Sequence, residues 1–136
     1  MKFRIEEDSL GKVRVPRNAL WGAQTQRAID NFPISGISMN FPFTNTFIAM
    51  LGYVKDAAAR ANKNLKLLEA KKQKVISRAA KEVWTNKHGK EFPIDVFQTG
   101  SGTSSNMNAN EVIANLATKY SKTLISPNDD VNMSQS

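Results

Sequence analysis

The residues best suited to bind a small anion lie between positions 98 and 111, where short hydroxyl side chains and two glycines precede an expected helix. Gly100 and Gly102 allow the backbone to approach a ligand closely. The first turn of a helix adds N–H groups that lack an intrahelical partner, at the positive end of the helix dipole. Ser101 and Thr103 add neutral hydroxyls that can orient carboxylate oxygens. The segment therefore indicates a site for a small anion such as a carboxylate.

A simpler interpretation of this segment is also available, because Ser and Thr commonly cap helices and glycine permits the turn before them. The segment lacks the lysine of a P-loop and the order G-x-G-x-x-G, so it does not indicate a nucleotide site. Its amides and hydroxyls are more numerous than capping requires. Capping and anion binding both stay open on the residues alone.

Other chemically capable residues favour structural roles. His88 is the only histidine and lies at a lysine-flanked helix end, where solvent exposure or capping is more common than catalysis. Asp129 and Asp130 follow Ser126 and Pro127, and we expect them to cap a helix start, because two carboxylates alone do not specify a cation site. With no cysteine and one histidine, we expect no metal site.

Composition sets the broad class of the protein. The 136 residues suit one domain, 1–136, and their 40% hydrophobic and 23% charged content is typical of a globular protein without membrane spans. The absence of cysteine and of a leader-like start favours a cytoplasmic location. The densest basic cluster comprises Lys63, Lys66, Lys71, Lys72, Lys74, Arg78, Lys81, Lys87 and Lys90. It has few aromatic residues, so we expect a solvated helix face and no nucleic-acid partner, despite a net charge of +7.

The elements that must position these residues are mainly helical. Residues 3–17 alternate apolar side chains around a turn at 8–11 and predict a short β-hairpin, and residues 19–28 predict a short, partly helical segment. Helical spacing then predicts three principal helices joined by long loops. The first helix begins at 44–46, and the second helix includes residue 69 in its first turn. The third helix follows Gly100 and Gly102.

Each principal helix has an apolar stripe that we expect to face the core. In the first helix the stripe is Phe47, Met50, Leu51, Val54, Ala58, Ala61 and Leu65. In the second it is Val75, Ile76, Ala79, Ala80, Val83 and Trp84, and in the third it is Met107, Ala109, Val112, Ile113, Leu116, Ala117 and Tyr120. The second helix is expected to end near 86–89, where Gly89 can adopt a left-handed cap. The third has Asn106, Asn108 and Asn110, which are unusual in a helix and predict hydrogen bonds beyond it.

Several separated motifs resemble one known enzyme family. In chain order they are Asp8-Ser9-Leu10-Gly11, Leu20-Trp21-Gly22-Ala23-Gln24-Thr25-Gln26-Arg27, Asn31-Phe32-x-Ile34-Ser35, Glu91-Phe92-Pro93, residues 98–111, and Pro127-Asn128-Asp129-Asp130-Val131-Asn132 with Ser134-Gln135-Ser136. Over nearly its whole length the chain is similar to the fumarase/aspartase superfamily. Trp-Gly-Ala-Gln-Thr-Gln-Arg and Thr-Gly-Ser-Gly-Thr resemble its class II fumarate hydratase branch, whereas aspartases carry Tyr-Tyr-Gly and Gly-Gly-Ala-Gly-Thr there.

This resemblance implies a mainly α, fumarase/aspartase-type N-terminal domain that takes part in the reversible hydration of fumarate to (S)-malate. It implies no metal or organic cofactor, and a homotetramer whose active sites combine three subunits. Ser101 and Thr103, with Gly102 between them, match positions that bind the substrate carboxylates. Ser136 matches the first residue of a Ser-Ser-Asn substrate-binding run.

A second dicarboxylate site of the family has a weaker counterpart here. Many members carry His-Pro-Asn-Asp at that site, whereas this chain has Ser126, Pro127, Asn128 and Asp129. Serine in place of histidine leaves these residues as candidates only.

The family's catalytic histidine and the serine of its mobile loop lie beyond the position that corresponds to Ser136. We therefore expect these 136 residues to be the N-terminal part of a longer polypeptide and to have no hydratase activity alone. Two alternatives stay open. One is the N-terminal domain of an aspartase-like ammonia lyase, and the other is a non-catalytic helical interaction module.

Overall fold

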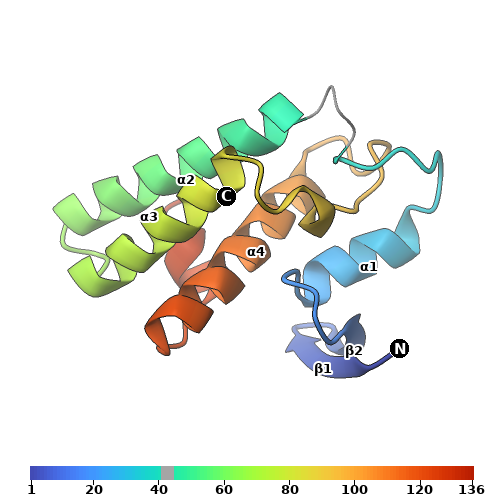
Figure 1. Cartoon of the computed structure of the whole chain (residues 1–136), viewed down its shortest axis with the longest axis horizontal. Helices are drawn as coiled ribbons and strands as arrows, with labels where there is room; N and C mark the ends of the chain where they lie inside the picture. Colours follow the sequence, from blue (N-terminus) through green and yellow to red (C-terminus); the bar gives the residue numbers. More distant parts are fainter. Residues whose placement is uncertain (41–44) are drawn as a thin grey trace.

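Outside positions 41–44, the main elements of the chain are four α-helices and one β-hairpin (Figure 1). The computed structural model describes residues 1–40 and 45–136. The main elements are β1 (Phe3–Asp8), β2 (Gly11–Pro16), α1 (Ala23–Asn31), α2 (Asn45–Asn64), α3 (Ala70–Trp84) and α4 (Thr103–Ser121). They confirm the mainly α fold with an N-terminal hairpin and three principal helices. The expected loop up to Pro42 ends outside the described residues, as does a helix start at Thr44.

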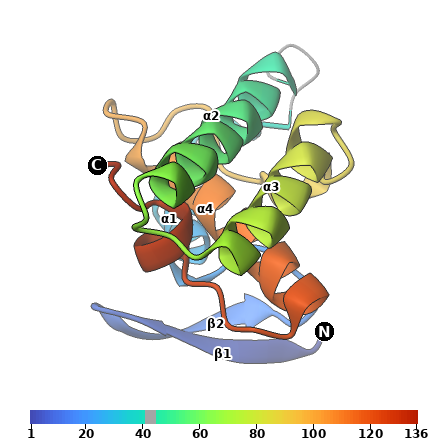
Figure 2. The same ribbon diagram turned by 90° about the vertical axis from the view of Figure 1, so that its left-hand side faces the viewer.

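The helices form a layered arrangement around α4. α2 and α3 lie side by side as an antiparallel pair, and α4 packs between this pair and α1 (Figure 1). In the perpendicular view the hairpin lies across the end of the molecule opposite α2 (Figure 2). None of the helices in residues 1–40 and 45–136 is long and apolar enough to cross a membrane.

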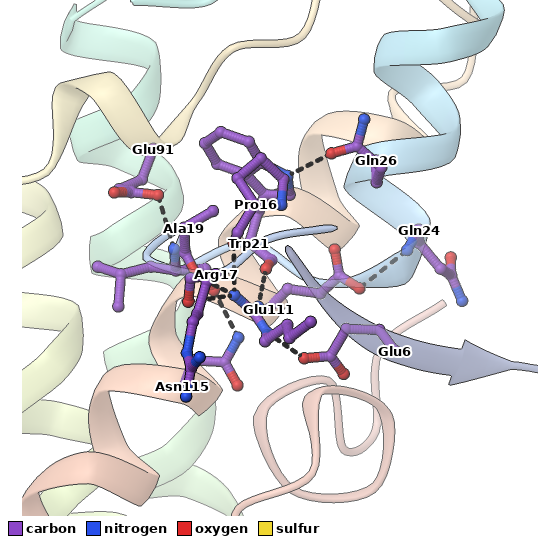
Figure 3. A network of polar contacts seen from close by, with 12 residues as sticks. Glu6, Pro16, Arg17, Ala19, Trp21, Gln24, Gln26, Glu91, Glu111 and Asn115 are labelled. Atoms are coloured by element: carbon purple, nitrogen blue, oxygen red, sulfur yellow. Dashed lines mark hydrogen bonds and ion pairs between the residues drawn. The ribbon is translucent and has the colours of Figure 1, made fainter. Parts of the chain in front are cut away.

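Arg4 joins the hairpin to the segment that leads to α1. β1 and β2 pair antiparallel, and Gly11 adopts a φ of 112° in the tight turn between them. The Arg4 guanidinium donates to the backbone oxygens of Pro16 (2.9 Å), Ala19 (2.7 Å) and Trp21 (2.6 Å), among others. Figure 3 shows this network, in which the linking segment to α1 folds around one cation.

The core is centred on α4 and the facing side of α3. The stripe expected for the second helix is confirmed, since Ile76, Ala79, Ala80 and Val83 are buried and Val75 and Trp84 are partly buried. The apolar residues expected for the third helix are also buried, apart from the partly buried Tyr120. These buried residues of α4 are Met107, Ala109, Val112, Ile113, Leu116 and Ala117.

The core stripe expected for α2 is wrong for most of its residues, although Leu51 packs against the core. Phe47, Met50, Val54 and Leu65 are between 45% and 66% exposed. The buried positions of α2 are instead Ile48, Ala49, Gly52, Lys55, Ala59 and Asn62. The reason is the close approach of α3: a Cβ on Gly52 would lie 3.0 Å from the backbone oxygen of Ala80. Gly52 therefore allows α3 to approach closely, and most of the larger apolar side chains of α2 face outward.

The end of α3 also differs from the expectation. The helix ends at Trp84, and Asn86 rather than Gly89 adopts the left-handed conformation, with a φ of 58°. Asparagine tolerates this region better than most residues. Gly89 begins a short 3₁₀ turn, η2 (Gly89–Glu91), where a Cβ would collide with Asn40.

The loop before α4 is anchored by Asp95, which is 8% exposed. Its carboxylate accepts hydrogen bonds from the backbone N–H of Ser35 (2.7 Å), Gly36 (2.9 Å) and Phe97 (2.8 Å). Burial by itself would raise the pKa of Asp95, but these donors hold it at about 2. The extended segment 94–99 thus pairs with the preceding loop through a single bridge between Ser38 and Asp95.

The basic cluster is a mostly solvated face, as predicted. Eight of its nine residues are exposed, and Lys72 is the exception. Lys72 pairs with Asp130 at 3.1 Å, and the Arg78 guanidinium lies 3.8 Å from the centre of the Tyr120 ring.

Candidate carboxylate-binding site

The predicted anion segment is the N-terminus of α4. Gly102, in the N-cap position, has a φ of 77°, a conformation that favours glycine. The cap does not come from Ser101 or Thr103, because Gln98 Oε1 accepts from the backbone N–H of Ser105 at 3.1 Å and from its hydroxyl at 3.0 Å. Because Gln98 fills the capping role, the Ser101 and Thr103 hydroxyls bond each other and not the helix backbone within the described residues.

Ser101 and Thr103 come together at this helix start. Their hydroxyl oxygens are 2.9 Å apart and both residues are exposed. Within the described residues, the backbone N–H groups of Thr103 and Ser104 have no hydrogen-bond acceptor. Two hydroxyls and two free amides at the positive end of a 19-residue helix form a suitable environment for a carboxylate.

A buried lysine lies close to this helix start, although the sequence reasoning did not select it. Lys55 of α2 is 1% exposed, and its ammonium donates to the side-chain oxygens of Asn106 (2.5 Å), Asn132 (3.1 Å) and Gln135 (2.7 Å). All three acceptors are neutral, and Lys55 forms no salt bridge within the described residues. Burial lowers the pKa of Lys55 to about 8.

The segment that ends at Ser136 is held by α2. Asn62 donates to the backbone oxygen of Met133 at 3.0 Å and accepts from the Ser134 hydroxyl at 3.0 Å. Lys55 binds Gln135, the residue before Ser136. Ser136 is exposed, and no hydrogen bond joins it to Ser101 or Thr103 in the described part of the chain. The structure thus brings Ser101 and Thr103 together, and it connects the segment before Ser136 to α4 through Lys55 and through the hydrogen bond between Asn106 and Asn132.

The candidate residues Ser126 to Asp129 form a helix start, as the capping interpretation predicted. Ser126 precedes η3 (Pro127–Val131), a single π-helical turn, and its hydroxyl accepts from the Asp129 N–H at 3.0 Å. In return, Asp130 accepts from the Ser126 N–H at 2.8 Å. Asp130 caps through its carboxylate, whereas Asp129 contributes its backbone N–H.

A cavity of about 370 Å³ lies between this helix start and the hairpin. Its lining includes Ser126, Pro127 and Asn128, and also four carboxylate side chains. These acidic residues are Glu6, Glu7, Asp8 and Glu111. Arg4 pairs with Glu6 at 2.6 Å and Arg27 pairs with Asp8 at 2.9 Å, so both nearby cations are already neutralised. The charges around Ser126 therefore disfavour a dicarboxylate.

Asn106 and Asn108 of α4 form the predicted hydrogen bonds beyond the helix, whereas Asn110 does not. Asn106 bonds Lys55 and donates to Asn132 at 3.2 Å, and Asn108 donates to the backbone oxygen of Glu91 at 2.9 Å. Asn110 donates only to the sulfur of Met107, within its own helix, at 3.3 Å. The side-chain oxygens of Asn108 and Asn110 are buried without a partner in the described chain.

Glu111 is a second buried residue whose role the sequence did not reveal: it connects α4 to the start of α1. Its carboxylate accepts from the backbone N–H groups of Gln24 (3.0 Å) and Thr25 (2.9 Å), and from the Thr25 hydroxyl (2.5 Å). It lies so close to Gly22 that a Cβ there would be 2.6 Å from its oxygen. Glu111 thereby accepts hydrogen bonds from backbone N–H groups in the first turn of α1, which have no partner within that helix, and holds α1 against α4. Figure 3 shows the bond from Gln24.

His88 occupies a structural position. Its Nε2 lies 2.9 Å from a carboxylate oxygen of Glu82, within the same end of α3 and its following turn. The side chain of His88 is 21% exposed and makes no capping hydrogen bond, so it pairs with Glu82 where solvent exposure or capping was expected.

The sequence contained only a weak indication that Lys55 is buried. Lys55 lies on the helical stripe of Ile48, Gly52, Ala59 and Asn62, which is short of large apolar residues. A lysine is almost never fully buried without a pair, so pattern reasoning places it in solvent. The polar residue Asn62 on the same stripe was the one indication of a buried polar cluster on this face of α2.

Comparison with known proteins gives consistent matches. A family model described as Lyase matches residues 11–136. The class II fumarate hydratase of Xylella fastidiosa is 57% identical over 135 residues, which are 99% of this chain and 28% of that protein. The corresponding protein of Mycobacterium tuberculosis is 58% identical over 134 residues, 98% of this chain and 27% of that protein.

Solved structures agree with these sequence matches. A fumarate lyase:delta crystallin structure from Brucella melitensis has a TM-score of 0.93 and 43% identity, over 99% of this chain and 32% of that chain. A class II fumarase from Schistosoma mansoni has the same TM-score and 37% identity, over 99% of this chain and 29% of that chain.

This chain spans less than a third of the length of each of these proteins. The match nevertheless covers nearly all of the 136 residues, both in sequence and in fold. The chain therefore belongs to the lyase family, in agreement with the resemblance of its motifs to the fumarase/aspartase superfamily and its class II fumarate hydratases.

Proposed function

We propose that this chain is the part of a fumarate hydratase that binds the substrate carboxylates. The observation that carries the proposal is the start of α4, where the hydroxyls of Ser101 and Thr103 are 2.9 Å apart beside free backbone N–H groups. Gly102 lets the backbone turn there, and Ser136 adds a hydroxyl from the segment held by Lys55. The ligands are fumarate and (S)-malate.

The chemistry of the proposed reaction suits these donors. When a base removes the C3 proton of malate, the electron pair moves into the neighbouring carboxylate and gives an aci-carboxylate. The C2–O bond then breaks, and the hydroxyl leaves as water with a proton from an acid. Fixed neutral donors at a helix N-terminus stabilise the additional charge on the carboxylate as it develops. Ser101 and Thr103 are assigned this role, and none of the described residues is assigned as the acid or the base.

We place substrate binding at the start of α4 and not at Ser126, Pro127, Asn128 and Asp129. At the second location the Ser126 hydroxyl is occupied by capping, and the adjacent cavity is lined by carboxylates. A dianion would meet repulsion there and attraction at the helix start.

The remaining parts of the proposed enzyme lie outside these residues. The relatives are more than three times as long as this chain, and we assign the catalytic acid and base to the part it does not cover. The exposed apolar side chains of Phe47, Met50 and Val54 on α2 support burial of this face in a larger assembly. A homotetramer in the cytoplasm, with sites shared between subunits, completes the proposal.

The binding role is tested by amide NMR on the 136-residue chain during titration with fumarate. We expect saturable shifts of the Thr103 and Ser104 amides, and Thr103→Val should weaken binding about fivefold or more, the loss of one hydrogen bond. Thr123→Val, at an exposed threonine past the end of α4, is the control and should bind as the unaltered chain does. Absence of saturable shifts in the unaltered chain would overturn the binding role.

Activity is measured from the ultraviolet absorbance of fumarate. The 136-residue chain should give no turnover, because the acid and base are assigned elsewhere. If the 136-residue chain turned over fumarate, and Thr103→Val abolished that turnover, this assignment would be contradicted.

A further inference from the structure

Lys55 is an unusual group for the interior of a helical domain. It is 1% exposed, yet its ammonium faces three amide oxygens and has no carboxylate partner among the described residues. Burial of a cation without an opposite charge is expensive. A fold that contains such a group pays a stability cost that simple packing of α2 would not require.

The contacts of Lys55 come from three places in the sequence. Asn106 lies in the second turn of α4, Asn132 follows η3, and Gln135 lies just before Ser136. The lysine is therefore the common contact between the proposed carboxylate-binding helix start and the segment that carries Ser136.

Lys55 also determines which way these amides point. An ammonium has only donors, so each facing amide must present its oxygen. The NH₂ groups then point elsewhere: Asn106 donates to Asn132 at 3.2 Å, and Gln135 donates to the backbone oxygen of Val131 at 3.0 Å. Without the ammonium, the amides of Asn106 and Gln135 could flip.

The charge of Lys55 lies near the proposed ligand. Residues three apart on a helix have Cβ atoms about 5–6 Å apart, so Asn106 is the helical neighbour of Thr103. The ammonium contacts Asn106 directly. Its field is weakly screened because the group is buried and unpaired.

We propose that Lys55 is a positioning residue of the dicarboxylate site. Its ammonium holds residues 132–135 against the first turns of α4, so that Ser136 and Thr103 can engage one substrate, and it supplies an unpaired positive charge toward the dianion. This inference rests on the proposed function for its ligand, but the connection between the two segments can be tested without a ligand.

The connection is tested by amide hydrogen exchange on the 136-residue chain. Lys55→Met removes the donor, and we expect exchange at Asn132 and Gln135 to rise about tenfold or more while Ala80 in α3 keeps its rate. Lys63→Met, at an exposed lysine of the same helix, is the matched control and should change neither. Equal exchange at Asn132 and Gln135 in Lys55→Met and the unaltered chain would overturn the connection.

A second variant keeps the test valid if Lys55→Met unfolds the chain, which faster exchange at Ala80 would reveal. Gln135→Met removes one acceptor of Lys55 at the partly exposed end of the cluster, together with the NH₂ group that donates to Val131 and Met133. It should loosen the amide of Asn132 and leave Ala80 unchanged. Unchanged exchange at Asn132 in this variant would also count against the connection.

The charge is tested by fumarate titration of Lys55→Gln, which keeps an NH₂ donor but has no charge. We expect a smaller rise in exchange at Asn132 than in Lys55→Met, because two N–H donors remain, and about tenfold weaker fumarate binding, because the charge is lost. A purely structural role for Lys55 predicts unchanged binding, and that result would overturn the electrostatic part. If the unaltered chain itself binds no fumarate, the proposed function fails, while the exchange measurements still decide the connection.

Discussion

Replacing Lys55 with methionine should change how the stability of the chain depends on pH. The pKa of Lys55 falls from 10.5 to about 8 on folding because the ammonium is buried. A difference of this size corresponds to no more than about 3 kcal/mol between the protonation states. The charged lysine therefore costs the folded chain up to about that amount at neutral pH.

The direction in which the free energy of unfolding changes with pH follows from the protons bound by the folded and unfolded chains. Between pH 8 and 10.5 the unfolded chain keeps the Lys55 proton and the folded chain has lost it. The free energy of unfolding contributed by Lys55 therefore rises with pH across this window. Lys55→Met lacks this contribution, and leaves the oxygens of Asn106 and Gln135 without their donor at a cost of about 1–3 kcal/mol each.

The assay is urea unfolding followed by far-ultraviolet circular dichroism at several pH values from neutral to 10.5. The difference in unfolding free energy between the unaltered chain and Lys55→Met should grow by up to about 3 kcal/mol in favour of the unaltered chain. Taking the difference cancels the titration of other lysines and tyrosines. Lys63→Met should run parallel to the unaltered chain. A difference for Lys55→Met that stays constant with pH would refute the reasoning.

Three further outcomes follow from single contacts. Glu111→Gln presents an NH₂ group to the donors of Thr25 and should lower the free energy of unfolding by about 1–3 kcal/mol, measured by thermal unfolding; no loss would contradict its anchoring of α1. Ser126→Ala removes the acceptor for the Asp129 N–H and should cost about 1 kcal/mol in urea unfolding, whereas an equal midpoint would exclude the cap. Because the pKa of Asp95 is lowered to about 2, its stabilising effect is complete above 3.8 and is lost as pH falls toward 2. Asp95→Asn should be less stable at neutral pH and lose less on acidification, and identical acid profiles would contradict this.

Local sequence patterns determined much of the fold and the chemistry of the candidate site. The hairpin follows from alternating apolar residues around Gly11, whose φ of 112° suits glycine. The buried faces of α3 and α4 follow from helical spacing, because each has one clear apolar stripe. Glycines and hydroxyls around Thr103 indicated an anion site because their backbone and side-chain donors are neighbours in sequence.

Tertiary structure alone decided which face of α2 is buried and which distant groups meet. α2 offers two stripes at helical spacing, and the approach of α3 onto Gly52 selects the one with small side chains. Glu111 meets Thr25 across 86 residues, and Lys55 meets Gln135 across 80. Such contacts depend on packing between elements, so no local period predicts them. For the same reason a lysine that sequence patterns place in solvent can be the buried link between the two parts of the candidate site.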